Sequence, residues 1–391
     1  MTKLKLTDIA HYSGKRVQPF DGVKKYLSTG DLKDEGLSFE EVTYKSKPSR
    51  ADIIVSEGDI LFAKMVNTTK VLQIDKMLDG IIVSTGFSVH KPDENILHGN
   101  YLIQFLKNNS FLRQKNKLCT GAIQSAISNT GIEKIFVPVP SIPEQIQIAN
   151  ILSKAETLIE QRKQSIALLD EFLKSTFLEM FGDTTTNRKK WDKVELKYFG
   201  EIITGNTPPR NNPENYSSKF IEWIKTDNIT SENIYITSAV EYLSETGLKN
   251  ARTVESGALL VACIAGSIES VGRAALTNRK VSFNQQINAI QPNDGVSPLY
   301  LYWLFKISKS YVQNAASNGM KKILTKGGFE KIKMIKPPKE LQTQFANIVT
   351  KTEILKEQYK NSLQELENLY GSLSQRAFKG ELKAERKAYS L

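Results

Sequence analysis

The sequence predicts an α+β protein in which two mixed α/β domains are joined and separated by an antiparallel pair of long coiled-coil helices, with pseudo-twofold symmetry. Three observations predict this architecture. The chain of 391 residues repeats itself at an offset of 197, so that Gly131 aligns with Gly328. Each copy begins with short β-rich runs broken by Gly, Asn and Pro turns. Each copy ends in a long segment with apolar residues at coiled-coil spacing.

The repeat is strongest towards the end of each copy. Between Gly131 and Phe181, 20 of 51 positions carry the same residue 197 positions later. Further upstream, YLSTGDL aligns with WIKTDNI, and YLIQFL aligns with YLYWLF. The chain is therefore expected to consist of a first domain, a central helix, a linker, a second domain, a C-terminal helix and a basic tail. Their predicted bounds are 1–142, 143–182, 183–192, 193–339, 340–380 and 381–391.

The net charge and the cysteines limit the classes of function. Lys plus Arg outnumber Asp plus Glu by 53 to 42, a formal net charge of +11. Such a surplus favours nucleic acid over a small metabolite as the partner. Cys119 and Cys263 lie far apart, which argues against a zinc ribbon or a disulfide framework and fits the cytoplasm. Neither a signal peptide nor a membrane span is expected, because charges interrupt every long apolar run.

The segment after Ser141 is expected to form one long helix. Ser141 and Glu144 have capping-box spacing, Pro143 lies near the first turn, and neither proline nor glycine recurs before Gly182. Apolar residues then recur at alternating steps of four and three in both copies. The predicted seam residues are Ile148, Leu152, Ile159, Ile166, Leu169 and Leu173 in the first copy and Phe345, Val349, Tyr359, Leu363, Leu366 and Tyr370 in the second.

A single helix cannot bury such a seam alone, so the two copies are expected to pair as an antiparallel coiled coil. A helix of roughly 38 residues measures about 57 Å, long enough to act as a spacer between two domains. Four seam positions are polar, namely Arg162, Thr176, Thr352 and Lys356. They either fix the register of the pair or lie at the edge of the seam and reach water.

Polar and basic side chains cluster in the predicted turns of both domains. Asn and Gln can bond adenine through two hydrogen bonds, Arg and Lys can bond guanine, and either cation can contact phosphate. The DNA-binding candidates are Lys64, Asn67, Thr69 and Lys70 in the first domain and Arg210, Lys225, Ser267, Arg273, Gln285, Gln286, Lys321 and Lys322 in the second. For any single residue a solvated loop position is the simpler interpretation, but the set as a whole favours DNA binding.

The sequence contains no recognisable catalytic motif. It has no phosphate-binding loop of the Gly-x-x-x-x-Gly-Lys-Ser/Thr type, so ATP hydrolysis is not expected in this chain. GNTPPR differs from the Asn-Pro-Pro-aromatic motif of amino-group methyltransferases, because Thr207 and Arg210 occupy the wrong places. His11, His90 and His98 have neither metal-ligand spacing nor a nucleophile beside them. We therefore expect no catalytic residue, metal site or cofactor in this chain.

The junctions IEKIFVPVPSIPEQIQIANIL and FEKIKMIKPPKELQTQFANIV, together with GNTPPR, WIKTDNI and FNQQINAI, resemble the specificity subunit of type I restriction-modification systems over essentially the whole chain. The resemblance implies that each domain is a target recognition domain, which reads one half of a split DNA site through the major groove. It also implies a complex with two modification subunits, which use S-adenosylmethionine to methylate adenine, and with restriction subunits, which use ATP and Mg.

The first domain departs most from this pattern. It has no clear counterpart of GNTPPR, and STGFSVHK replaces FNQQINAI. Two unlike domains are expected to read an asymmetric site, because the symmetry of a protein is mirrored in its target. Two alternatives remain open: a DNA methyltransferase or nuclease with atypical motifs, and a coiled-coil scaffold whose globular parts bind protein.

Overall fold

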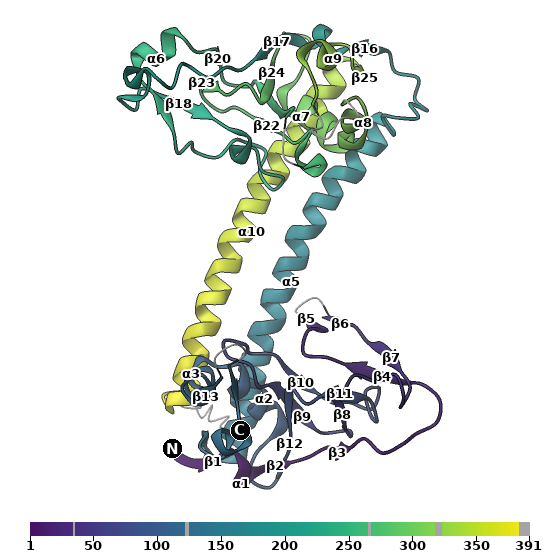
Figure 1. Cartoon of the computed structure of the whole chain (residues 1–391), viewed down its shortest axis with the longest axis vertical. Helices are drawn as coiled ribbons and strands as arrows, with labels where there is room; N and C mark the ends of the chain where they lie inside the picture. The colour runs from purple at the N-terminus through teal and green to yellow at the C-terminus, as the bar shows by residue number, and fades with distance from the viewer. Residues whose placement is uncertain (34–35, 122–124, 265–266, 317–322, 383–391) are drawn as a thin grey trace, which may run out of the picture. The chain divides into compact units, whose positions relative to one another are not determined.

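The computed structural model describes residues 1–33, 36–121, 125–264, 267–316 and 323–382. The chain forms two compact units (Figure 1). Unit 1 combines Met1–Gln164 with Asn361–Leu391, and unit 2 is Ser165–Lys360. The boundaries cut both long helices, so each unit contains one globular domain and half of each helix.

Unit 1 is built on two main sheets. The four-stranded sheet has the order β10-β9-β12-β2, and the five-stranded sheet has the order β3-β8-β11-β4-β7. Their strands are β2 (Ala10–Tyr12), β3 (Lys15–Arg16), β4 (Lys24–Leu27), β7 (Glu40–Val42), β8 (Ala51–Ile54), β9 (Ile60–Ala63), β10 (Val71–Gln73), β11 (Ile82–Ser84) and β12 (Phe87–Pro92). Among the neighbouring described strands of these two sheets, β4 and β11 run parallel and the other pairs run antiparallel.

Short strands and helices complete unit 1. Three two-stranded ladders join β1 (Thr2–Lys5) to β15 (Phe136–Val139), β5 (Leu32–Lys33) to β6 (Gly36–Leu37), and β13 (Cys119–Thr120) to β14 (Ala126–Ile127). The helices are α1 (Leu6–Ile9), α2 (Gly99–Lys107), α3 (Asn109–Leu118) and α4 (Asn129–Ile132). Asn108 caps α3, because its side chain accepts a hydrogen bond from the backbone N of Ser110.

Unit 2 repeats the strand order of the first sheet and has four strands instead of five in the second. Its sheets have the orders β17-β24-β21-β22 and β19-β18-β23-β20, and β16 pairs with β25. The strands are β16 (Lys193–Glu195), β17 (Gly200–Thr204), β18 (Ile221–Ile224), β19 (Tyr242–Leu243), β20 (Thr253–Val254), β21 (Leu259–Ala262), β22 (Ala274–Leu276), β23 (Val281–Phe283), β24 (Ile287–Pro292) and β25 (Lys333–Ile335). Strands β18 and β23 run parallel, as β4 and β11 do in unit 1.

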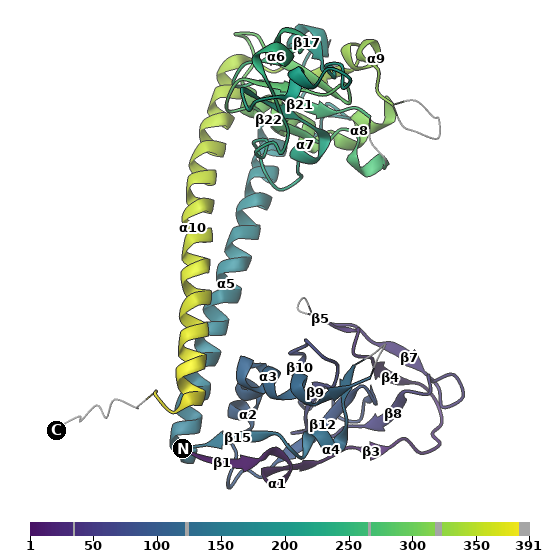
Figure 2. The ribbon, with the colours of Figure 1, turned by 60° about the vertical axis from the view of Figure 1, so that its left-hand side comes forward.

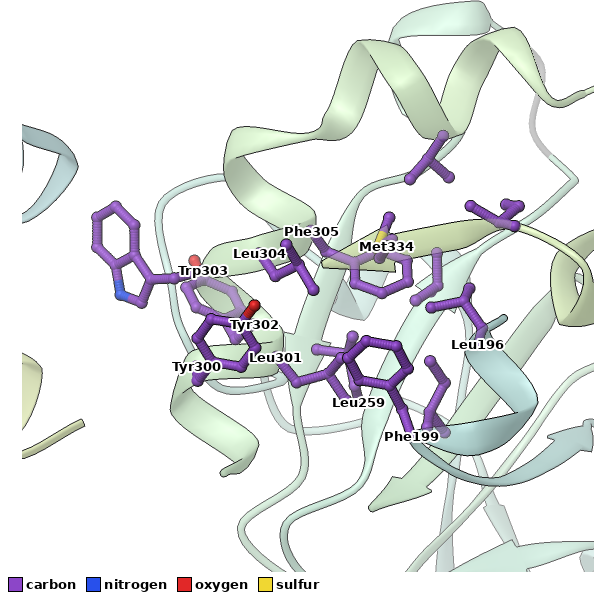
Figure 3. Packing of buried hydrophobic residues seen from close by; sticks show 14 of the residues in the cluster. Leu196, Phe199, Leu259, Tyr300, Leu301, Tyr302, Trp303, Leu304, Phe305 and Met334 are labelled. Atoms are coloured by element: carbon purple, nitrogen blue, oxygen red, sulfur yellow. The ribbon is translucent and has the colours of Figure 1, made fainter. Parts of the chain in front are cut away.

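The helices of unit 2 pack against both of its sheets. They are η1 (Leu196–Tyr198), η2 (Pro213–Tyr216), η3 (Thr226–Asn228), α6 (Glu245–Lys249), η4 (Ile268–Ser270), α7 (Pro298–Ile307), α8 (Lys309–Asn314) and α9 (Lys326–Glu330). Of these, α6 and η2 lie beside β19, and α7 and α9 lie beside the first sheet. Figure 3 shows Leu301 and Phe305 of α7 packed with Phe199, Leu259 and Met334 in one buried cluster. The side chain of Trp303 projects away from these residues, and its ring centroid lies 6.0 Å from that of Phe345.

The two long helices are α5 (Ile142–Phe181) and α10 (Lys339–Lys379). Glu144 supplies one half of the predicted capping box at the start of α5, since its Oε2 accepts a hydrogen bond from Ser141 N at 3.0 Å, while Ser141 Oγ donates to the same oxygen at 2.7 Å. Gly182, with a φ of 76°, ends it in the left-handed conformation. With 40 residues, α5 is about 60 Å long.

Within each unit, the halves of α5 and α10 pack side by side (Figures 1 and 2). In unit 2 the ring centroids of Phe177 and Phe181 lie 5.3 and 5.6 Å from that of Phe345. In unit 1 the early residues of α5 share a buried cluster with Ala377 and Phe378 of α10. The end of α5 therefore packs near the start of α10 in unit 2, and the start of α5 packs near the end of α10 in unit 1. The two helices run antiparallel. The α+β fold class expected from the sequence is confirmed.

The seam positions differ in depth along the helices. Ile148, Leu152, Leu173, Phe345 and Val349 are buried. The others are half-buried, namely Ile159, Ile166, Leu169, Tyr359, Leu363, Leu366 and Tyr370. The seam is thus tightest where each helix half meets the core of its own unit.

Polar residues also occupy the seam. Lys356 is buried, and its Nζ lies 2.5 Å from Asp170 Oδ1. Thr352 is buried as well, whereas Arg162 and Thr176 are half-buried. The position of Lys356 fits a residue that fixes the register of the helix pair. In the part of the chain that the structure describes, no helix is both long and apolar enough to cross a membrane.

Candidate nucleic-acid interface

The described candidate residues lie in turns at one edge of each unit. Tyr26 and Leu27 of β4 pair with Ile82 and Val83 of β11 in parallel register, so the turns that follow both strands lie at the same edge. The β9–β10 loop joins them there. We call residues 28–31, 64–70 and 84–86 the turn edge of unit 1. The turn edge of unit 2 is defined in the same way, by residues 205–210, 225–228, 267–273 and 284–286.

All four candidates of unit 1 lie in the β9–β10 loop. Lys64 N donates to Gly86 O at 2.9 Å, and Lys70 Nζ donates to Thr29 O at 2.8 Å. These two bonds connect the loop to both neighbouring turns. Asn67 and Thr69 are exposed. The loop therefore offers two exposed polar side chains between two lysines that also secure the edge.

The turn between β23 and β24 holds Gln285 and Gln286 of unit 2. Gln286 has a structural position: its backbone O accepts from Cys263 N at 2.8 Å, and its side-chain Oε1 accepts from Asn284 Nδ2 at 2.9 Å. Gln285 is exposed, and its Oε1 accepts a hydrogen bond from Thr207 Oγ1. Of the two glutamines, Gln285 is the better placed for an external partner.

GNTPPR lies beside this turn because the backbone approaches closely at Gly205. A Cβ at Gly205 would lie 2.2 Å from Asn284 O, a distance that only glycine tolerates. Asn206 N then donates to Phe283 O at 3.0 Å, and Asn206 Oδ1 accepts from Arg252 N at 2.8 Å. These contacts hold the loop that carries Arg210 at the turn edge.

Arg210 and Lys225 form one cationic cluster on an aromatic platform. The Arg210 guanidinium lies 4.5 Å from the Tyr216 ring centroid and 4.9 Å from that of Trp223, and Lys225 Nζ lies 5.2 Å from that of Trp223. Glu241 binds both cations, with 2.6 Å between Arg210 Nη2 and Glu241 Oε2. Hydrogen bonds from Lys225 and then Arg210 lower the pKa of the Glu241 carboxyl. The cluster therefore keeps one net positive charge in an orientation set by the rings.

The remaining candidates belong to the connection between β21 and β22. Ser267 is exposed, and its Oγ lies 3.2 Å from Ser270 Oγ. Arg273 holds the position in unit 2 that Lys70 holds in unit 1. Lys70 O accepts a hydrogen bond from Ala63 N at the end of β9, and Arg273 O accepts one from Ala262 N at the end of β21. Arg273 Nε is buried and has no hydrogen-bond partner among the described residues. Lys321 and Lys322 lie outside the described residues.

The missing counterpart of GNTPPR in unit 1 has a structural reason. Strand β17 has five residues, whereas β2 has three. After β2, Ser13 N donates to Val89 O at 3.0 Å, and Gly14 adopts a φ of 86°. The chain then pairs with β8 of the other sheet. It leaves the first sheet before reaching the turn edge, so unit 1 has no loop equivalent to residues 205–210 there.

The structure adds residues that the sequence analysis did not select. Thr29 accepts the bond from Lys70, and Tyr216, Trp223 and Glu241 support Arg210 and Lys225. Thr29 could have been found from the alignment of YLSTGDL with WIKTDNI, which places Thr29 opposite Thr226. Glu241 has no such signal, because its contacts with Arg210 and Lys225 arise only from the pairing of β18 with β19.

The histidines and acidic residues are of residue types that can bind a metal ion. Within the described ranges, no group of three His, Cys, Asp or Glu side chains could hold a metal ion. His90 is buried, with Nε2 at 2.8 Å from Ser88 Oγ and Nδ1 at 3.0 Å from Ala10 O. Burial lowers its pKa to about 4. His90 is therefore a neutral core residue at pH 7.

Comparisons with known proteins agree with this architecture. The family model described as "Type I restriction modification DNA specificity domain" matches residues 1–169 and 188–368. The type I restriction enzyme HindI specificity subunit of Haemophilus influenzae is 23% identical over 396 residues, which cover 81% of this chain and 85% of that protein.

Solved structures show the same fold. A chain from a structure of complex assembly and conformational transition in the type I R-M system has a TM-score of 0.63 and 19% identity, covering 97% of this chain and 98% of that chain. The type I restriction-modification S subunit from M. genitalium has a TM-score of 0.57 and 14% identity, covering 96% of each chain.

Proposed function

The chain belongs to the family of type I restriction-modification DNA specificity subunits, and on that premise we propose that each of its units reads one half of a split DNA target. The observation that carries the proposal is the repeated fold with unlike turn edges. The two units share the order of strands in their first sheets, but they present different side chains at the corresponding turns. Different contact residues at equivalent places favour an asymmetric target, because a symmetric protein would read a palindrome.

The side chains of the turn edges divide into two roles. Lysines and arginines contact phosphates, which supply most of the affinity and its salt dependence. Asn67, Thr69 and Gln285, which are exposed, contact base edges in the major groove. Arg210 serves either role, since a guanidinium can bond guanine through two hydrogen bonds or bind phosphate.

The chemistry belongs to other subunits in this proposal. The chain binds double-stranded DNA and assembles with two modification subunits, which carry S-adenosylmethionine and methylate adenine, and with restriction subunits that use ATP and Mg. The target adenine is flipped out of the stack by the modification subunit, because its reactive nitrogen is otherwise inaccessible. The chain itself acts in the cytoplasm as the guide that selects where methylation or cleavage occurs.

The helices α5 and α10 have a separate role. Each continues without interruption from residues of one unit into residues of the other, and they serve as a spacer that sets the gap between the two half-sites. Their exposed faces provide the docking surface for the modification subunits. Exposed apolar residues of α5 support this role, namely Ile146, Leu158, Leu168 and Phe172.

A reconstitution experiment tests the proposal. The purified chain, the modification subunit and their mixture are each incubated with genomic DNA and S-adenosylmethionine. Only the mixture is expected to methylate adenine at defined sites. Methylation by the purified chain alone would assign the chemistry to this chain and refute the proposal. Methylation by the modification subunit at the same sites without this chain would refute its role as the guide.

A further inference from the structure

A lysine lies beneath the β9–β10 loop of unit 1. Lys115 of α3 has 0% exposure. Its Nζ donates to Ala63 O at 3.1 Å and also to Thr68 O. Ala63 ends β9 and Thr68 lies near the tip of the loop, so one ammonium group joins both limbs of the loop from inside.

This buried charge has no counterion among the residues that the structure describes, where no carboxylate oxygen lies within 4.0 Å of Lys115 Nζ. Burial accordingly lowers the pKa of Lys115 to about 8. A buried ammonium is costly unless its hydrogen bonds are satisfied. Here the loop backbone accepts from two of its three donors, and Lys115 Nζ also lies 5.7 Å from the Phe111 ring centroid.

The next residue of α3 holds the tip of the same loop. Asn116 Oδ1 accepts from Asn67 N at 3.0 Å, and Asn116 Nδ2 donates to Asn67 Oδ1 at 2.8 Å. Asn67 has a φ of 56°, a left-handed conformation that Asn tolerates better than most residues. Two consecutive residues of α3 therefore fix the loop at Ala63, Asn67 and Thr68.

Unit 2 supports its corresponding loop differently. In this unit Gln313 Nε2 of α8 donates to Val271 O at 3.0 Å. Among the described residues, α3 thus supports its loop with an ammonium and an amide, and α8 supports its loop with an amide.

We propose that Lys115 and Asn116 are positioning residues, which set the conformation in which the β9–β10 loop reads the first half of the DNA target. This inference rests on the proposed function. Neither side chain needs to touch a base. Discrimination between bases depends on how Asn67 and Thr69 are presented, and that presentation is fixed from beneath by α3.

Substitutions in the complete complex test the proposal. Lys115→Met keeps the length and burial of the side chain but removes its donors, and Asn116→Ala removes the contacts with Asn67. The control is Lys117→Met, which removes the same charge from an exposed position of the same helix. Each full chain is assembled with its modification subunits and given a DNA library randomised in both half-sites. The methylated molecules are then sequenced.

Lys115→Met and Asn116→Ala are each expected to lose about ten-fold in base preference at one or more positions of the first half-site. Preference at the second half-site is expected to stay unchanged, as is the behaviour of Lys117→Met. A merely structural role would lower the melting temperature without changing the preference of the folded protein. Should Lys115→Met fail to fold, Asn116→Ala decides, because it leaves the buried ammonium in place. Folded variants with the wild-type preference at both half-sites overturn the proposal.

A loop variant separates this inference from the proposed function. Asn67→Gly/Thr69→Ala keeps a residue that accepts the left-handed conformation but removes both exposed polar side chains. If this variant changes the preference and the α3 variants do not, the positioning role fails while the loop remains the reader. If neither class changes the first half-site, the assignment of the loop to base reading fails too.

Discussion

The cluster around Glu241 shows how a single residue contact can be tested. Arg210 is stacked against Tyr216 and Trp223, so little side-chain freedom remains to be lost when it binds DNA. Arg210→Ala is expected to weaken binding of the complex to its target by about ten-fold or more. The control is Arg188→Ala, at an exposed position of the same unit. Binding titrations at several salt concentrations measure both.

The salt dependence then assigns the role of Arg210. A phosphate contact predicts a salt slope lower by about one and equal losses on all sequences, whereas a base contact predicts a loss confined to the cognate second half-site. Equal affinities of Arg210→Ala and the wild type at all salt concentrations would remove Arg210 from the interface.

His90 makes the stability of unit 1 depend on pH. Its pKa is about 4 in the folded protein and about 6.5 in an unfolded chain. Between these values the unfolded chain binds more protons, so the free energy of unfolding falls as the pH drops from about 6.5 to about 4, by at most about 3 kcal/mol. Denaturant unfolding of the wild type and His90→Gln at a series of pH values measures this difference.

The control for this measurement is His11→Gln, at an exposed position of the adjacent strand β2. It is expected to keep the loss of stability of the wild type in acid. An equally steep loss in His90→Gln would show that other groups cause it.

At the scale of elements, the helix pair is the feature that the sequence predicts best. The spacing of Ser141, Glu144 and Gly182 predicts a helix within one residue of the observed α5, because capping is local chemistry. The aligned segments YLIQFL and YLYWLF lie in equivalent helices, α2 and α7. The spacing of apolar residues does not predict that β4 and β11 run parallel, because strand pairing depends on residues far apart in the chain.

The candidate site was predictable only in part, because its contacts also join residues that lie far apart in the chain. Turn composition selects Asn67, Thr69 and Gln285, which the structure leaves exposed. It also selects Gln286, which the structure uses within its own turn. The bonds from Lys115 to Ala63 and Thr68 connect residues about 50 positions apart, and no local pattern indicates them.

The buried ends of the seam should dominate the stability of the helix pair. Leu173 has 0% exposure, whereas Leu168 of the same helix has 62%. Leu173→Ala is expected to lower the free energy of unfolding by about 2–5 kcal/mol, and Leu168→Ala by less than about 0.5 kcal/mol. Denaturant unfolding measures both. Similar losses for the two variants would contradict the packing of α5 against α10.

At the scale of the whole molecule, the spacer role predicts a change in target geometry. Seven residues inserted into each helix, after Gln164 and after Lys360, keep the seam on the same face. They lengthen each helix by about 10.5 Å, or about three base pairs at 3.4 Å each. The half-sites are expected to stay the same while the gap between them grows. Altered half-sites with an unchanged gap would contradict the spacer role.

The central claim is that two unlike units read an asymmetric DNA target. One measurement tests it most directly. The measurement is long-read sequencing of methylated adenines in host cells with and without this gene. Two unlike half-sites separated by a fixed gap of unspecified bases are expected, present only when the gene is present. A palindromic or uninterrupted methylated sequence, or the same methylation pattern without the gene, would contradict the account.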